Sequence, residues 1–342
     1  MPIAKTWLLL LVLSLLVAAV TLPRFNRADY LVDAMTGDRA GHHEVYVGPV
    51  QWIRGKMGLY GAPDVPGEQL LEAPFSYRLV VPTLAAVLPF QPMTAINMLN
   101  VLFVVSAVLL LYRLQRRLAI ADRDALLGCA LFAVLFPTFY YSTIGWVDPV
   151  VVFAVTACLN LIYDRRHSHA ALVIGFGFLA KENIVMVLPA LAAGAWRTSG
   201  SWKQAVLWTM LATAIWLGLF VAVRTWVPVP LHWDSHWYIV SLEMIERNVL
   251  RSRSWLTLML CAATVAAPFV LRKLHPLAEL RRRAMDPLWL PMWAGLAGAA
   301  AHYGYSWLVA HTDGRMFWPI FCFAIPIAIH LTSGSRWARR AV

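Results

Sequence analysis

The sequence predicts an all-α fold, a polytopic membrane helical bundle with about ten transmembrane helices. Of the 342 residues, 60% are hydrophobic and only 14% are charged, and the mean hydropathy is +0.63. A soluble protein usually carries about 25% charged residues. The 16 Trp residues agree with this class, because Trp favours membrane interfaces. We treat residues 1–342 as a single transmembrane domain.

Apolar stretches of membrane-spanning length recur along the whole chain. The stretch 7–22 is expected to be an uncleaved first span, because many more spans follow it. The stretch 79–112 is too long for one span and contains Pro89 and Pro92, so a short helix, a break and then a span are expected. The expected spans are 7–22, 95–112, 125–140, 147–163, 170–180, 184–195, 206–227, 255–271, 288–309 and 316–331.

Two long polar segments separate these stretches. Residues 24–78 form the first predicted extracytoplasmic loop, and residues 228–253 form the second large one. Short interfacial helices are expected in the first loop, above all at 45–57, where Tyr46, Val50 and Ile53 would share one face.

The charge distribution predicts the orientation of the bundle. By this assignment most Lys and Arg residues lie on the side of the termini, so both termini are expected to be cytoplasmic. The net charge of +11 is interpreted as a loop bias toward anionic lipid, and no basic run suits nucleic acid. No internal repeat is evident, so the sequence gives no support to an inverted-repeat transporter.

Three carboxylates of the first loop are candidates for a general base. Asp29 and Asp33 are four residues apart and would share a face if their stretch is helical. Glu44 follows two histidines. A carboxylate just beyond a first span can remove a proton at the membrane surface. The alternative is that all three are solvated loop charges.

Further candidates lie where polar chain meets apolar chain. Tyr77 and Arg78 stand at the end of the first loop, where a guanidinium either reaches the interface or binds a phosphate. Lys181 and Glu182 interrupt apolar chain that has no other charge from 170 to 196. Ionisable groups at membrane depth usually pair or face a cavity. The alternative is a break at the outer surface with both side chains in water.

Two other motifs complete the set. Asp148 is best explained as a helix cap with Pro149 at the first helical position, although a cap at this place could still contact a substrate. Arg315 would face Arg78 across the bundle and suit a phosphate, or it would pair with Asp313 at the interface.

Metal binding and disulfides receive little support. The alternation of His232, Asp234 and His236 has no distant third ligand, so an interfacial loop is the better interpretation. The four Cys residues lie in apolar runs and are expected to be buried free thiols. No metal site is predicted.

The layout of the chain resembles the GT-C superfamily of membrane glycosyltransferases, in particular small bacterial members that use polyprenyl-phosphate-linked sugars. Three stretches carry the likeness: PFSYRLVVP at 74–82, AKENIVMVLPAL at 180–191 and DGRMFWPIFCFAIP at 313–326. They are similar to a proline-flanked YR motif, to an RE or KE stretch ahead of a membrane proline, and to a late span of the R-x-x-x-P type.

The resemblance implies sugar transfer at the outer face of the bacterial cytoplasmic membrane, to a glycan, lipid or protein acceptor. Asp29 or Asp33 would then be the base, with Glu44 as the third candidate. Donor phosphate contacts would come from Arg78, Lys181 and Arg315, and Glu182 would orient Lys181 or the sugar. No cofactor is implied, and a need for a divalent metal is left open.

Two other classes remain open. A transporter or flippase of a lipid-linked or anionic solute would use the same basic groups without a base. A non-catalytic subunit of an envelope assembly complex would tolerate replacement of the outer carboxylates. Sugar transfer to an acceptor is the property that distinguishes a glycosyltransferase from a transporter and from a non-catalytic subunit.

Overall fold

The fold is helical throughout the part of the chain that can be described. The computed structural model describes residues 3–26, 45–59, 71–229, 240–274, 280, 286–309 and 314–333. Within these ranges the secondary-structure elements are α-helices and 3₁₀-helices, so the all-α prediction is confirmed. Asp29, Asp33, Glu44 and Asp313 lie outside the described residues.

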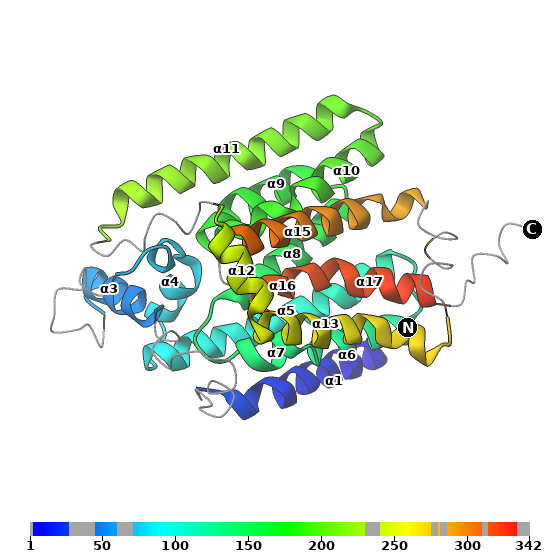
Figure 1. Cartoon of the computed structure of the whole chain (residues 1–342), viewed down its shortest axis with the longest axis horizontal. Helices are drawn as coiled ribbons and strands as arrows, with labels where there is room; N and C mark the ends of the chain where they lie inside the picture. The colour runs from blue at the N-terminus through cyan, green and yellow to red at the C-terminus, as the bar shows by residue number, and fades with distance from the viewer. Residues whose placement is uncertain are drawn as a thin grey trace, which may run out of the picture.

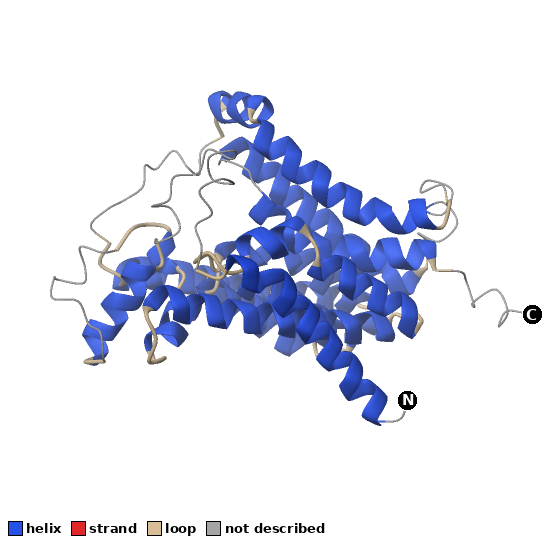
Figure 2. Ribbon diagram, turned by 90° about the horizontal axis from the view of Figure 1, so that it is seen from below, coloured by secondary structure: helices blue, strands red, loops and turns tan. Residues whose placement is uncertain are grey.

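The body of the molecule is a bundle of helices that run along its long axis (Figure 1; Figure 2 gives a second view). These helices are α1 (Ile3–Thr21), α5 (Pro92–Arg117), α6 (Asp122–Ala133), α8 (Asp148–Tyr163), α9 (His167–Phe176), α10 (Leu188–Ser199), α11 (Trp202–Trp226), α13 (Ser252–Leu271), α15 (Leu290–Val309) and α17 (Phe321–Thr332). Helix α1 begins and α17 ends at the same end of the bundle, which we call the terminal end (Figure 1). The opposite end is the loop end.

Shorter elements gather at the loop end. They are η1 (Leu22–Arg24), α3 (Val47–Met57), η4 (Phe75–Tyr77), α4 (Val80–Ala86), α7 (Phe136–Tyr141), η5 (Gly177–Leu179), η6 (Glu182–Val187), α12 (Leu242–Leu250), α16 (Gly314–Phe317) and η9 (Trp318–Ile320). One more short element, η8 (Pro287–Trp289), precedes α15 at the terminal end. Helix α3 lies furthest from the terminal end (Figure 1).

Four helical stretches of the described residues are long and apolar enough to cross a membrane: Pro92–Arg117, Trp202–Trp226, Ser254–Leu271 and Gly314–Thr332. The rest of the ten expected crossings stay predictions. Helix α11 shows why a membrane is needed, because among its 25 residues only Ala212 and Val223 are buried. Apolar side chains such as Met210 and Val221 are exposed instead. A helix that is apolar all round belongs in hydrocarbon.

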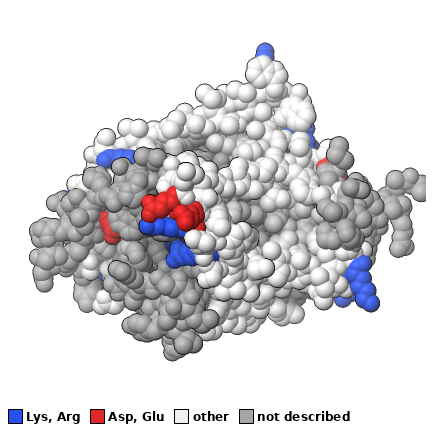
Figure 3. Space-filling model, viewed as in Figure 1, with Lys and Arg blue, Asp and Glu red and all other residues white. Residues whose placement is uncertain are grey.

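Charged side chains are also unevenly distributed over the surface. On the face drawn in Figure 3, the visible charged side chains gather over α12 and at the two ends of the molecule. The region between α12 and the terminal end carries almost none (Figure 3). Together with the four membrane-length helices, this apolar surface identifies a membrane-associated protein.

Helix α8 is the centre of the bundle. Twelve of its 16 residues are buried, and it packs against α5, α9, α10 and α17. A helix surrounded in this way brings its first turn into the interior of the loop end. Asp148, the first residue of α8, is therefore only 1% exposed.

The predicted breaks were partly right. The break after the short helix α4 is confirmed, since α5 begins at Pro92. The single span expected at 125–140 was wrong, because the chain there forms α6 and α7 with a break after Ala133. Pro137 stands in the first turn of α7, where its missing N–H costs nothing. The Thr138 hydroxyl donates to the Phe132 carbonyl, 2.8 Å away, and so satisfies a group freed at the end of α6.

Arg54 fixes α3 against α4. Its Nε donates to the Ala86 carbonyl at 3.1 Å, and its Nη2 donates to the carbonyls of Leu88 at 2.8 Å and Phe90 at 2.7 Å. The last carbonyls of a helix have no partner within it. Arg54, which is 3% exposed, supplies donors for carbonyls at and after the end of α4. The chain that follows Arg78 is thereby held in place.

The prediction for the four cysteines is confirmed. Cys129, Cys158, Cys261 and Cys322 are all buried, and all are free thiols.

Candidate functional site

Five charged side chains meet at the loop end, and we call them the loop-end cluster. Arg78 follows η4, Asp148 opens α8, and Arg315 lies in α16. Lys181 lies in the break between η5 and η6, where its backbone is extended, and Glu182 is the first residue of η6. The indole of Trp216 in α11 donates to the Glu182 carbonyl at 3.2 Å and holds this break against the bundle.

Arg78 and Glu182 form a two-pronged ion pair. The Arg78 Nε donates to Glu182 Oε2 at 2.9 Å, and Nη2 donates to Oε1 at 2.6 Å. The remaining nitrogen, Nη1, donates to the Tyr46 hydroxyl at 2.5 Å. Arg78 is 8% exposed, and two parallel charged hydrogen bonds fix the plane of a guanidinium strongly. The pair therefore holds Arg78 in one orientation.

Lys181 pairs with Asp148. The Lys181 Nζ lies 2.5 Å from Asp148 Oδ1. The prediction that Asp148 caps its helix was wrong, because Val147 occupies the cap position and no side-chain capping bond forms. Leaving a buried lysine without a counter-charge costs more free energy than leaving a helix without a side-chain cap, so Asp148 pairs with Lys181. The Asp148 Oδ2 is buried and has no hydrogen-bond partner among the described residues.

Arg315, the fifth residue of the cluster, packs against an aromatic ring. Its guanidinium carbon lies 3.4 Å from the centroid of the Trp146 ring, a cation–π contact. The Trp146 ring meets Tyr46 edge to face at 6.2 Å and lies 6.3 Å from Phe75. Trp146 therefore contacts Arg315 on one side and Tyr46 on the other, and the Tyr46 hydroxyl accepts from Arg78.

The pairing sets the protonation of these groups, which lie outside the membrane-length helices. Burial alone would raise the pKa of Glu182, but the charge and hydrogen bonds of Arg78, together with a backbone hydrogen bond and the Lys181 charge, outweigh burial and lower this pKa to about 2. Burial raises the pKa of Tyr46 to about 12, against the opposing effect of Arg78. Burial lowers the pKa of Lys181, and Asp148 only partly offsets that effect. At neutral pH Glu182 is therefore ionised and Tyr46 is a neutral phenol.

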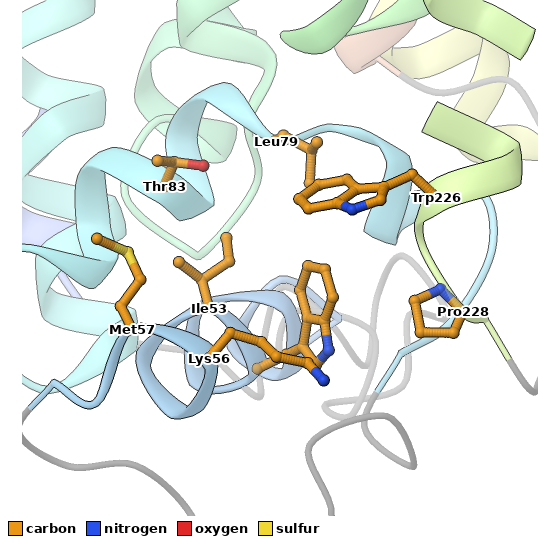
Figure 4. Close-up of a pocket in the computed structure, with 8 residues that line it drawn as sticks. Ile53, Lys56, Met57, Leu79, Thr83, Trp226 and Pro228 are labelled. Atoms are coloured by element: carbon orange, nitrogen blue, oxygen red, sulfur yellow. The ribbon is translucent and has the colours of Figure 1, made fainter. Parts of the chain in front are cut away.

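An apolar groove of about 480 Å³ lies beside the cluster (Figure 4). Its walls are Trp52, Ile53, Lys56, Met57, Leu79, Thr83, Trp226 and Pro228. Leu79 follows Arg78 directly in the chain. Trp52 from α3 and Trp226 from α11 meet edge to face at 5.7 Å and close one part of the groove.

Arg224 links this groove to the cluster. Its guanidinium carbon lies 3.5 Å from the Phe220 centroid and 4.6 Å from the Tyr77 centroid. Tyr77, which was predicted as a substrate contact, therefore supports Arg224 with its ring. Another cation thus stands between the groove and the loop-end cluster.

The structure brings together five of the predicted site residues: Arg78, Asp148, Lys181, Glu182 and Arg315. The alternative of Lys181 and Glu182 standing in water was wrong, because Lys181 is 9% exposed and both side chains are paired. Of the two roles predicted for Glu182, that of orienting Lys181 is corrected, since Glu182 binds Arg78 and Asp148 binds Lys181. The role of orienting the sugar stays a prediction.

Sequence reasoning missed three members of the site. Tyr46 was assigned only to the apolar face of α3, because nothing in the pattern marks its hydroxyl as a partner of Arg78. Trp146 adjoins the Asp148 motif, yet its stacking with Arg315 joins residues far apart in sequence. Arg224 ends an apolar helix, where a snorkelling basic residue is ordinary.

Within the described ranges, no group of three or more His, Cys, Asp or Glu residues is placed to hold a metal ion. Comparison with models of protein families, with curated proteins and with solved structures gives no match.

Proposed function

We propose that the protein is a membrane glycosyltransferase that moves a sugar from a polyprenyl-phosphate-linked donor to an acceptor at the outer face of the cytoplasmic membrane. The observation that carries the proposal is the loop-end cluster, in which buried Arg78 and Lys181 lie at one end of a membrane bundle, each held by a carboxylate. Likeness to GT-C enzymes in three short stretches gives the reaction class.

The charge of the cluster suits such a donor. Among the described residues, the cluster places three cations beside two carboxylates. A sugar linked through a phosphodiester carries one negative charge, and its departing phosphate gains a second. Cations fixed in a site of low dielectric stabilise that developing charge, and fixing them beforehand saves reorganisation during the reaction. Glu182 and Asp148 perform this fixing for Arg78 and Lys181.

The transfer step needs one base and one leaving group. The base takes the proton of an acceptor hydroxyl, whose oxygen forms a bond to the anomeric carbon of the sugar. The bond from that carbon to the phosphate oxygen breaks, and its electron pair leaves with the lipid phosphate. Asp29, Asp33 and Glu44 remain the candidates for the base. Arg78, Lys181 and Arg315 would contact the phosphate.

The apolar groove suits the first part of the donor lipid. A chain leaving a phosphate near Arg78 would meet Leu79, then Trp226, both of which line the groove. Burial of hydrocarbon there would contribute about 25 cal/mol for each Å². Alternation of helices between the two ends also supports the ten expected crossings with both termini on one side (Figure 1).

The test uses membranes that contain the protein and a radiolabelled polyprenyl-phosphate sugar. Arg78→Gln should lower the rate of transfer to acceptor about 10²-fold or more, as loss of one fixed donor commonly does. Arg113→Gln is the matched control, because Arg113 is more than half exposed and lies at the terminal end, paired with Asp164. This control should keep the wild-type rate.

Two outcomes would count against the proposal. If Arg78→Gln transfers sugar at the wild-type rate, the cluster has no part in the reaction. If wild-type protein in vesicles moves the labelled donor across the bilayer but forms no glycosylated product, the transporter alternative takes its place.

A further inference from the structure

Arg24 is a buried cation that the proposed reaction does not use. It ends η1, directly after the first apolar helix, and is 3% exposed. Its guanidinium carbon lies 3.8 Å from the centroid of the Tyr140 ring. None of its three side-chain nitrogens has a hydrogen-bond partner in the described part of the chain. The other cations of the loop end described above have a carboxylate, a hydroxyl, a carbonyl or several rings.

The position of Arg24 is fixed by the backbone around it. The Asn26 amide donates to the Thr143 carbonyl at 3.1 Å, and the Thr143 hydroxyl donates to the Thr21 carbonyl at 2.9 Å. The Asn97 side chain donates to Asn26 Oδ1 at 2.8 Å. These bonds join the end of α1 to the start of α5 and to the turn after α7. Arg24 is thus held in place rather than free to reach bulk water.

The residues that precede Arg24 show where the outward-facing apolar surface of this stretch ends. Leu15 is 59% exposed and Leu22 is 54% exposed, so α1 presents apolar side chains outward up to the residues just before Arg24. Arg24 therefore stands just beyond the last outward-facing apolar side chain of this stretch, where a basic residue commonly marks the end of a span. Tyr140 covers one face of the guanidinium, and its buried nitrogens have no hydrogen-bond partner among the described residues.

We infer that Arg24 binds a phosphate group, as a site separate from Arg78 and Lys181. Uncompensated burial of a cation is costly, whereas a guanidinium fork and phosphate oxygens match in geometry and charge. Between Arg24 and the loop-end cluster stand Tyr140 and Tyr141, whose rings meet edge to face at 4.7 Å. Arg315 lies beyond them, 5.7 Å from the Tyr141 centroid. The phosphate belongs either to a lipid headgroup or to a small solute.

The experiment measures the melting temperature of the full-length protein in zwitterionic detergent. The probes are phosphatidylglycerol, phosphatidylcholine and inorganic phosphate, each added separately. Phosphatidylglycerol should raise the melting temperature of the wild type by a few degrees, and phosphatidylcholine should not. Arg24→Met should lose this response. Without a probe it should be at least as stable as the wild type, because it removes a buried charge that no described side chain neutralises.

The control is Arg247→Gln in α12, whose helix is bonded to the end of α15 at the same end of the bundle. Arg247 is exposed and pairs with Glu243 in the same helix, so this variant should respond to phosphatidylglycerol as the wild type does. A response to inorganic phosphate as large as that to the lipid assigns the site to small solutes, and a response to the lipid alone assigns it to headgroups.

Arg24→Lys keeps the charge and loses the fork, so its melting temperature should rise less than that of the wild type. Arg24→Lys also provides the test of phosphate binding if Arg24→Met fails to fold. The inference is overturned if either Arg24 variant responds to phosphatidylglycerol as fully as the wild type. It is equally overturned if no probe stabilises the wild type.

Discussion

Three cations of the loop-end cluster have identified partners. Arg78 has the Glu182 carboxylate, Lys181 has Asp148, and Arg315 has the Trp146 ring. The sequence marks Arg78 and Lys181 as unusual, since charges at the edge of apolar chain are costly. The pairings themselves link residues 104 and 33 positions apart, and no local pattern encodes such a distance.

The Lys181–Asp148 pair gives a prediction at the scale of single residues. Lys181→Met leaves a buried carboxylate without its counter-charge and should cost about 3–5 kcal/mol of stability. The double variant Lys181→Met, Asp148→Asn should regain most of that stability, because no charge is left unpaired. Thermal unfolding of both variants in detergent, compared in a double-mutant cycle, measures the coupling.

Measuring sugar transfer distinguishes a role of Lys181 in donor binding from a purely structural role of the pair. If Lys181 contacts the donor phosphate, the double variant recovers stability but not sugar transfer. Full recovery of both properties would mean that the pair is purely structural.

At the scale of elements, breaks in helices were predictable where proline or charge marks them. The breaks near Pro92 and at Lys181 are both present in the structure. The break between α6 and α7 was missed, although Pro137 stands there, because a proline in apolar chain is also tolerated within membrane helices. The hydrogen bond from Thr138 to Phe132 that accommodates the break involves two ordinary side-chain types.

The contact between α3 and α4 depends on one residue. Arg54→Met should lower the melting temperature strongly, because hydrogen bonds to a charged group contribute about 1.5–3 kcal/mol each and carbonyls near the end of α4 lose their donor. Thermal unfolding in detergent is the measurement. Lys56→Met on the same helix, where the side chain is exposed, is the control.

Arg54→Lys refines this result. A lysine keeps the charge but cannot span several carbonyls with a rigid fork, so its melting temperature should lie between those of the wild type and Arg54→Met. Equal stability of Arg54→Met and the control would show that α3 and α4 are held together by their apolar contacts alone.

At the scale of the whole molecule, the apolar middle and the two charged ends predict a definite topology. Single cysteines at Lys56 and Arg247, near the loop end, should react with a membrane-impermeant maleimide in intact cells. Cysteines at Lys203 and Lys273, near the terminal end, should react only after permeabilisation. The four native cysteines are buried and give a low background. The opposite labelling pattern would place the loop-end cluster on the cytoplasmic side.

The sequence by itself determined the class of the fold, because apolar length and low charge leave helices in a membrane as the way to satisfy backbone hydrogen bonds. It also identified Arg78, Lys181, Glu182 and Arg315, since burial makes such residues expensive enough to stand out. Only the tertiary structure decided which carboxylate holds which cation, that Asp148 is a counter-charge and that Tyr46 and Trp146 belong to the site. The reason is that these contacts arise from how α8 is buried among its neighbours, and packing between distant helices leaves no periodic mark in the chain.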